Sequence, residues 1–266
     1  MGQPVTPPPL STVDLADFSP GFTAGLTKAE GRELRHDLRR RLGELQDLLY
    51  ADRRFGILVV LQGTDSSGKD STSNSVFEQV GPVGCSVVNF GVPSAEEAAH
   101  DFLWRYHDHA PERGKIVIFN RSHYESVLVE RVKNLVPEST WRPRYDQINR
   151  FEDMLVRENV VVLKFFLHIS SEEQRLRLQE RIDNPRKHWK FRAGDLEDRR
   201  DWDAYQAAFA DMVTFCNTAH APWHIIPADH KWYRDVVILR AIVASLEALD
   251  LAFPAAGDDM SGLVVV

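Results

Sequence analysis

The chain has 266 residues, of which 43% are apolar and 27% charged, enough for one large α/β domain with a well-buried core. A net charge of −7 and a pI of about 5.8 exclude a protein whose whole surface binds nucleic acid, so any polyanion must be bound locally. No apolar stretch approaches the ~18 residues that cross a bilayer, and the start has no signal-peptide layout, so we expect a cytoplasmic protein with no membrane or nucleic-acid partner.

The N-terminal part of the sequence divides into an arm and a helix. Residues 1–25 contain five prolines and little apolar periodicity, which predicts an irregular arm that lies across the surface. From residue 26 to 52 leucines recur every three to four positions, a spacing typical of an amphipathic helix whose arginines form a solvated face. We therefore expect an arm at 1–25, one domain at 26–252 and a C-terminal tail at 253–266.

After this helix, short apolar runs alternate with helical segments. The runs lack polar alternation and are typical of strands that are covered on both faces of a sheet. The alternation predicts a five-stranded parallel sheet with helices on both faces, which is the α/β class. Cys85 and Cys216 lie far apart without a CxxC spacing and are interpreted as small core residues. The predicted strands are 57–61, 85–90, 116–119, 160–169 and 224–226, and the predicted helices are about 69–80, 95–109, 123–134, 139–158, 171–182, 199–219 and 231–249.

The first apolar run leads into "GTDSSGKDST", in which Gly63, Gly68 and Lys69 fit the pattern G-x-x-x-x-G-K between a strand and a helix. Glycines let backbone N–H groups curl around phosphate oxygens, the following helix adds its positive end, and the lysine reaches a phosphate. The pattern therefore predicts a phosphate-binding loop. Its expected phosphate-binding residues are Gly63, Ser66, Ser67, Gly68, Lys69, Asp70 and Ser71.

Two aspartates make this loop unusual. Asp65 lies inside it, where a carboxylate repels phosphate unless a divalent cation lies between them. We therefore expect Asp65 to ligate Mg²⁺, with Mn²⁺ as the alternative ion. Asp70 occupies the position at which a hydroxyl side chain normally ligates magnesium, and it has two open interpretations: a metal-side carboxylate, or a first-turn residue that complements the helix dipole.

The stretch "IVIFNRSHYE" ends a predicted strand at Asn120, where many P-loop proteins have a metal-binding aspartate. Because asparagine is a neutral and weaker ligand, Asp65 and Glu125 must supply more of the negative charge around the metal. Arg121 has a planar fork suited to two phosphate oxygens, and an ordinary salt bridge is its alternative role.

Residues 175–192 contain seven lysines and arginines against two acids. Arg177 and Arg181 share one helical face, and Pro185 then breaks the helix into a basic loop with Lys187 and Lys190. Phosphoryl transfer requires mainly positioning and charge neutralisation, so a basic segment that closes over the loop suits it. Taken alone, this charge run would equally fit a solvated helix face.

Five motifs together resemble the polyphosphate kinase 2 family over residues of about 25–252. The motifs resemble most the branch called class III, which phosphorylates AMP and ADP. The resemblance implies a P-loop kinase-like three-layer fold, a mobile lid at about 175–200, inorganic polyphosphate as donor, and a homodimer or homotetramer. It also implies that Asn120 and Glu125 lie near the acceptor nucleotide. The motifs are "GTDSSGKDST", "PSAEEAAHDFLWR", "IFNRSHYESVLVERV", "ERIDNPRKHWKF" and "APWHIIPADHKWYRD".

The family commonly has alanines and a glycine in the loop, where this chain has Ser66, Ser67 and Ser71. We still expect a phosphotransferase that moves the terminal phosphoryl group of polyphosphate to an adenine nucleotide. The acceptor's phosphate oxygen is largely deprotonated at neutral pH, so no strong general base is needed. An ATP-dependent nucleotide kinase and a non-catalytic binding protein are the two alternatives. The expected catalytic residues are Asp65, Lys69, Arg121, Arg177 and Arg181.

Overall fold

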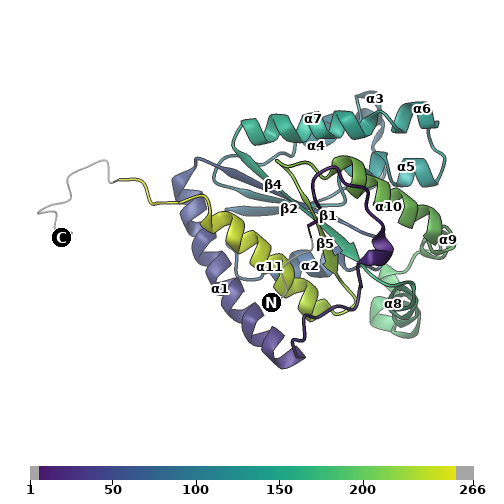
Figure 1. Cartoon of the computed structure of the whole chain (residues 1–266), viewed down its shortest axis with the longest axis horizontal. Coiled ribbons are helices and arrows are strands. Elements are labelled where there is room, and N and C mark those ends of the chain that lie inside the picture. The colour runs from purple at the N-terminus through teal and green to yellow at the C-terminus, as the bar shows by residue number, and fades with distance from the viewer. Residues whose placement is uncertain (1–5, 256–266) are drawn as a thin grey trace, which may run out of the picture.

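The computed structural model describes residues 6–255 and contains one sheet of five parallel strands in the order β2-β3-β1-β4-β5 (Figure 1). The α/β class and the predicted parallel sheet are therefore confirmed, and each predicted strand agrees with the structure to within one residue at either end. The strands are β1 (Gly56–Gln62), β2 (Cys85–Asn89), β3 (Ile116–Asn120), β4 (Val160–His168) and β5 (Trp223–Pro227).

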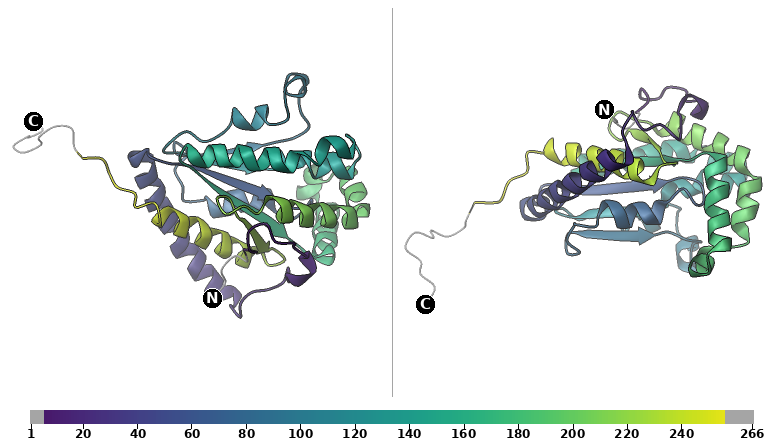
Figure 2. Two further views of the ribbon diagram at one scale, coloured as in Figure 1. Left: turned by 45° about the horizontal axis from the view of Figure 1, so that its top comes forward. Right: turned by 90° about the horizontal axis from the view of Figure 1, so that it is seen from below.

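Helices cover both faces of this sheet. Helices α1 (Lys28–Asp52) and α11 (Lys231–Glu247) run side by side on one face, while α7 (Arg144–Arg157) and α10 (Trp202–Cys216) cover the other (Figure 2). The fold is thus the three-layer arrangement that the sequence predicts. The remaining elements are η1 (Leu15–Asp17), α2 (Lys69–Val76), α3 (Ala95–Ala99), α4 (Trp104–His107), η2 (His123–Ser126), α5 (Val129–Val132), α6 (Glu138–Trp141), α8 (Ser171–Asp183), η3 (Pro185–Lys190) and α9 (Gly194–Arg200).

Several predicted helices are shorter than expected or broken. The predicted helix 139–158 is α6 followed by α7, because Pro143 lacks an N–H group and starts a new helix as its N-cap. The predicted helix 95–109 is α3 and α4, and between them the Asp101 side chain accepts a hydrogen bond from the N–H of Leu103 (2.9 Å). The predicted helices 123–134 and 199–219 are likewise each two pieces, η2 with α5 and α9 with α10.

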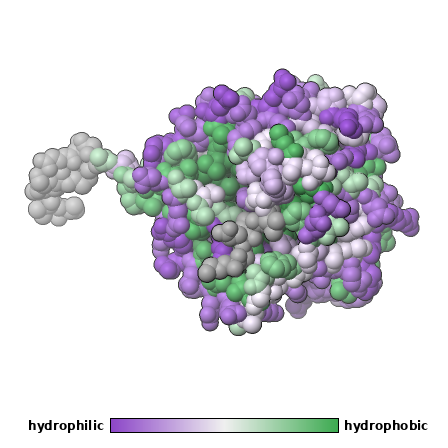
Figure 3. All heavy atoms as spheres, viewed as in Figure 1, coloured by the Kyte–Doolittle hydropathy of each residue, from purple (hydrophilic) through white to green (hydrophobic). Residues whose placement is uncertain are grey.

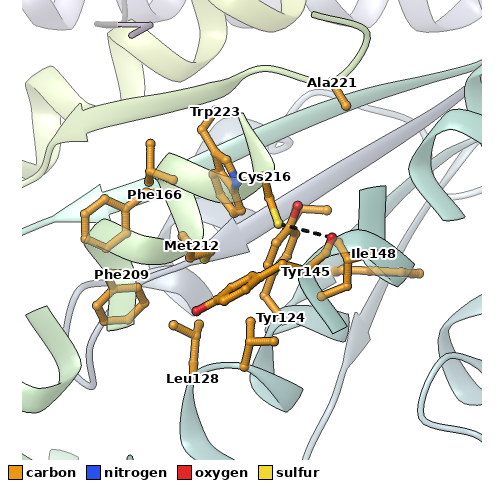
Figure 4. Close-up of a cluster of buried hydrophobic side chains, with 14 of the residues drawn as sticks. Tyr124, Leu128, Tyr145, Ile148, Phe166, Phe209, Met212, Cys216, Ala221 and Trp223 are labelled. Atoms are coloured by element: carbon orange, nitrogen blue, oxygen red, sulfur yellow. Dashed lines mark hydrogen bonds between the residues drawn. The ribbon is translucent and has the colours of Figure 1, made fainter. Parts of the chain in front are cut away.

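Strand β1 shows why these apolar runs become central strands. Its side chains alternate between two cores: Leu58 and Val60 pack in the layer of α7 and α10, and Ile57 and Val59 pack in the layer of α1 and α11. Part of the first core, around α10, is shown in Figure 4. The expectation of two covered faces is wrong for β2, where Val87 is 44% exposed, because β2 lies at the edge of the sheet.

The described part of the N-terminal arm packs against the domain. Val13 and Leu15 are buried in the core beside α10, and the N–H of Val13 donates to Thr214 Oγ1 (3.0 Å). Thr6 Oγ1 lies 2.7 Å from His224 Nδ1, so the arm passes along β5. Residues 1–5 of the arm and residues 256–266 of the predicted tail lie outside the described residues.

Among the described residues, no helix combines the length and the apolar character needed to cross a membrane. On the face shown in Figure 3, hydrophilic side chains occupy most of the outline, and hydrophobic patches gather nearer the middle. This distribution agrees with the high content of charged residues.

A network of buried charged and polar side chains joins strand β4 to helix α7 and to η2. Lys164 is completely buried and donates to Glu152 Oε2 (2.6 Å), to Tyr124 Oη (2.8 Å) and to the Cys216 carbonyl (2.7 Å). Burial alone would raise the pKa of Glu152, but the charge of Lys164 and the bond to His123 lower it. The network fixes η2, the turn that follows β3, against helix α7 and strand β4.

We expect Lys164→Met to destabilise the fold by about 3–5 kcal/mol, because it leaves the buried Glu152 carboxylate without its cation. Lys115→Met is the matched control: Lys115 pairs with the exposed Glu112, and its loss should cost about 0–1 kcal/mol. Urea unfolding followed by circular dichroism measures both. Equal unfolding midpoints for the two variants would contradict this reading of the network.

Candidate active site

The loop after β1 has the backbone geometry of a phosphate-binding loop. Gly63 has φ +154° and Gly68 has φ +104°, values that side-chain-bearing residues rarely adopt. A Cβ on Gly63 would lie 2.8 Å from the Leu167 carbonyl oxygen, and one on Gly68 would lie 2.2 Å from Arg234 Nη1. The loop ends at Lys69, where α2 begins, so the N-terminus of α2 points at the loop.

Lys69 lies under this loop. Its ammonium donates to the carbonyls of Gly63 (2.7 Å) and Thr64 (3.1 Å), and only 8% of the residue is exposed. Burial, together with the nearby Arg121 charge, lowers the pKa of Lys69. Because water solvates this cation poorly, an anionic phosphate at the loop would be a strongly favoured partner.

Strands β1 and β3 are neighbours, so the residues that follow them meet at one end of the sheet. Arg121 Nη2 donates to Asp65 Oδ1 (2.9 Å), and Arg121 Nη1 lies 3.9 Å from Glu125 Oε2. Burial would lower the pKa of Arg121, but the Glu125 and Asp65 charges raise it. Arg121 also has φ +63°, a left-handed backbone conformation that residues with a side chain rarely adopt.

A cavity lies between this group and the helices α9 and α10. Its walls include Asp65, Lys69, Arg121 and Glu125 from the predicted site, so the fold brings these four side chains together. Burial raises the pKa of Glu125. Four further side chains from outside the predicted site also line the cavity: Gln174, Asp198, Trp202 and Tyr205.

Asp198 is the most informative of the residues that sequence reasoning missed. It comes from α9, its Oδ1 lies 2.6 Å from Lys133 Nζ, and burial together with the neighbouring Asp65 carboxylate raises its pKa. For Asp65 burial acts in the same upward direction, yet Lys69 and Arg121 lower its pKa. The only sequence signal for Asp198 was its place within the predicted lid, since a single acid in a polar segment forms no motif.

Asp70 follows Lys69 in the chain, and its side chain contacts Asn120 at the end of β3. Asn120 Nδ2 donates to Asp70 Oδ1 (2.5 Å) and to Asn89 Oδ1 (2.7 Å). Asp70 stands in the first turn of α2, as the dipole interpretation requires, and its carboxylate is held by the strand-end amide. Both of its interpretations stay predictions, as does the place of Asn120 near an acceptor.

The predicted lid at about 175–200 forms most of α8, then η3 and α9, and these elements lie together at one end of the molecule (Figure 1). Arg181 donates to Asp195 Oδ2 (3.0 Å), Lys187 pairs with Glu180, and Lys190 lies over the exposed Trp189 ring (4.9 Å to the centroid). These three basic side chains are at least partly accessible.

Arg177 differs from the other basic residues of the segment. It is only 7% exposed, and its guanidinium donates to four backbone carbonyls and to Glu173. The expectation that Arg177 faces the transferred phosphoryl group therefore does not fit this arrangement, because spacing gave its helical face but not what that face packs against. The four carbonyls belong to Ser66, Ser67, Ala228 and Asp229.

The residues at the cavity fit a magnesium ion shared with a substrate. Within residues 6–255 no group of three or more acidic, histidine or cysteine side chains could hold a metal alone. Mg²⁺, however, is usually bound through one or two carboxylates together with substrate phosphates. Asp65 and Asp198 offer two carboxylates, and the buried Thr64 Oγ1 has no partner among the described residues.

The fold and this site together define a P-loop phosphotransferase: a phosphate loop on the central strand of a parallel sheet, faced by cationic side chains. Residues 25–254 match the family model of Polyphosphate kinase 2, and the chain belongs to the polyphosphate kinase 2 family. The family resemblance and the fold read from the sequence are thereby confirmed.

Three similar proteins agree with this assignment. An AMP/ADP-polyphosphate phosphotransferase of Meiothermus ruber is 51% identical over 91% of this chain and 91% of its own length. An ADP-polyphosphate phosphotransferase of Rhodopseudomonas palustris is 40% identical, with 85% of this chain and 83% of that protein covered. A crystal structure of Polyphosphate Kinase 2 from Arthrobacter aurescens TC1 has a TM-score of 0.91 at 37% identity, covering 94% and 90% of the two chains.

We expect Lys69→Ala to lower kcat by ~10²-fold or more, because the variant loses the only lysine at the phosphate loop while the backbone N–H groups stay. Lys115→Ala, at the opposite end of β3, is the control and should keep normal turnover. Steady-state kinetics, with circular dichroism to verify folding, measures the effect. Near-normal turnover in Lys69→Ala would contradict the assignment of residues 63–69 as a phosphate-binding loop.

Proposed function

We propose that this protein transfers the terminal phosphoryl group of inorganic polyphosphate to AMP and ADP, forming ADP and ATP. The observation that carries this function is the meeting of Lys69, Arg121 and Asp65 at one cavity between the phosphate loop and helices α9 and α10. The name of the 51% identical relative supports both acceptors.

The geometry suits a reaction that depends on positioning and charge. Lys69 would exchange its bonds to loop carbonyls for bonds to phosphate oxygens, and Arg121 would hold the phosphoryl group from the other side. The nucleophile is an oxygen of the acceptor's phosphate, which is largely ionised at neutral pH. For that reason neither Glu125 nor any other carboxylate has to remove a proton.

A bound Mg²⁺ would be held by Asp65, with Asp198 beside it, and would neutralise the negative charge on the phosphates. Asp65 now accepts a hydrogen bond from Arg121, so ion binding would release that guanidinium toward the substrate. Asn120 and Glu125 would lie near the acceptor nucleotide, and the family resemblance supports this part of the proposal.

We also propose a cytoplasmic homodimer or homotetramer. Strand β2 is an edge strand, and no charged residue occurs from residue 79 to 95, in a chain that is 27% charged. Exposed edges normally carry charges that prevent pairing, so this segment suits burial against a second copy. The edge at β5, in contrast, is accompanied by the N-terminal arm. Molar mass from light scattering tests this proposal.

The function is tested with ADP, long-chain polyphosphate and Mg²⁺ in the absence of ATP. We expect ATP to form, ADP to form when AMP replaces ADP, and both reactions to stop when EDTA removes the metal. Luminescence and ion-exchange chromatography measure the products. Turnover only with a nucleoside triphosphate donor would favour an ATP-dependent kinase, and binding without turnover would favour a non-catalytic protein.

The basic segment is the proposed track for the polymer. We expect Lys187→Gln with Lys190→Gln to raise the KM for long polyphosphate about tenfold, with a smaller effect on the KM for ADP, because two charge contacts to the polymer are lost. The salt dependence of the polymer's KM should also become shallower, since fewer counterions are displaced.

The control for this pair is Lys28→Gln with Lys115→Gln, which removes the same net charge from residues outside the segment in the sequence. Steady-state kinetics at several salt concentrations measures all four KM values. An equal change in the KM for ADP and for polyphosphate would mean that Lys187 and Lys190 do not form the polymer track.

A further inference from the structure

Two buried arginines contact the phosphate loop from its outer side. Arg177, on α8, donates through Nη1 to the carbonyls of Ser66 (3.0 Å) and Ser67 (2.8 Å). Arg234, on α11, donates through Nη1 to the carbonyl of Gly68 (3.3 Å). The two residues are 7% and 1% exposed. Three consecutive loop carbonyls therefore accept from side chains of helices that are distant in the sequence, and the Gly68 carbonyl also accepts from the N–H of Thr72 in α2 (2.8 Å).

Holding these carbonyls also orients the N–H groups of the loop. In a trans peptide the C=O and the following N–H point in opposite directions, and the described residues contain no cis peptide. When the arginines hold the carbonyls of Ser67 and Gly68, the N–H groups of Gly68 and Lys69 point away from them. The Ser66 carbonyl is in the same peptide group as the N–H of Ser67. That N–H donates to the Thr64 carbonyl (3.1 Å) and so closes the turn.

The cost of burying Arg234 indicates that its position is functional as well as structural. Burial lowers the pKa of Arg234, and the adjacent Asp235 opposes this shift. Asp235 Oδ1 accepts from both Nε (3.0 Å) and Nη2 (2.7 Å) of Arg234, which leaves Nη1 directed at the loop. Replacing such a buried pair with apolar residues is often neutral or stabilising, so stability alone is a weak reason for this arrangement.

Ser71 connects the unusual loop sequence to this arrangement. Its hydroxyl donates to the Gly68 carbonyl (2.9 Å) and accepts from Arg234 Nη1 (3.2 Å). The hydroxyls of Ser66 and Ser67, in contrast, are buried and have no partner among the described residues. One serine of the altered loop therefore supports its outer side, while two others leave polar groups unsatisfied.

We propose that Arg177 and Arg234 are positioning residues that hold the phosphate loop in its binding conformation before any phosphate arrives. Neither guanidinium contacts the transferred phosphoryl group; each acts through the loop carbonyls that it holds. The kinetic consequences rest on the proposed function, whereas the effect on the loop itself does not.

The test compares Arg234→Met, Arg234→Lys and Ser71→Ala with Arg150→Met. Arg150 lies on α7, outside the basic segment, and is exposed and paired with Asp146 (2.9 Å), so it controls for loss of an arginine. Amide hydrogen exchange measures opening of residues 63–72 without substrate. Calorimetry with long-chain polyphosphate measures affinity, and steady-state kinetics separates KM from kcat.

We expect faster exchange at residues 63–72 and about a tenfold or larger loss of polyphosphate affinity in Arg234→Met. Arg234→Lys should behave almost like Arg234→Met, because an ammonium keeps the charge but lacks the planar fork that reaches both Asp235 and the loop. Ser71→Ala should show a smaller change in the same direction, and Arg150→Met should show none.

Two results would overturn the proposal. Full affinity in Arg234→Lys would mean that charge matters and that the fork does not. A lower melting temperature in Arg234→Met with unchanged exchange at residues 63–72 would make Arg234 a residue of the core alone. If the wild-type protein fails to make ATP from polyphosphate, the proposed function fails, but the exchange measurement still decides whether Arg234 holds the loop.

Discussion

The turn of backbone at residues 63–68 is the constraint on which the rest of this protein depends. It joins a completely buried strand to a helix within six residues, and its carbonyl groups are removed from water as it does so. Buried carbonyls need donors, and the fold supplies them from behind through Arg177, Arg234 and Lys69. The inner side of the turn can then present N–H groups and hydroxyls to an anion.

The parallel sheet concentrates charge at the same place. All five strands end on one side, so the residues that follow β1 and β3 become neighbours although they are more than fifty positions apart. The result is a cavity with cations and carboxylates in near balance: Lys69 and Arg121 face Asp65, Glu125 and Asp198. Because these charges nearly cancel, the net charge of the cavity attracts a polyanion only weakly. Binding of phosphate therefore depends on an exchange: the cations leave the carboxylates and pair with phosphate, and the carboxylates pair with a metal ion.

The strands and the phosphate loop could be predicted because each is recognised from a short window of sequence: an apolar run for a strand, and the glycine and lysine spacing for the loop. The helix breaks at Asp101 and Pro143 were missed, since apolar periodicity continues across both positions. In the site, Asp65, Lys69 and Arg121 belong to recognisable motifs. Asp198 and Arg234 acquire their roles only through tertiary contacts, and the surroundings of Arg177 depend on how α8 docks on the loop. No spacing rule contains that information.

The contact between the N-terminal arm and β5 sets an order for folding. The arm residues near Thr6 and Val13 find their partners at Thr214 and His224, about two hundred positions later in the chain. During synthesis the arm is made before α10 and β5, so it has nowhere to dock until almost the whole domain has left the ribosome. Contacts of such long sequence separation form late, because loop closure costs entropy before any contact compensates for it. The arm can therefore cover the β5 edge of the sheet only after β5 has paired with β4, which makes arm docking one of the last steps of folding.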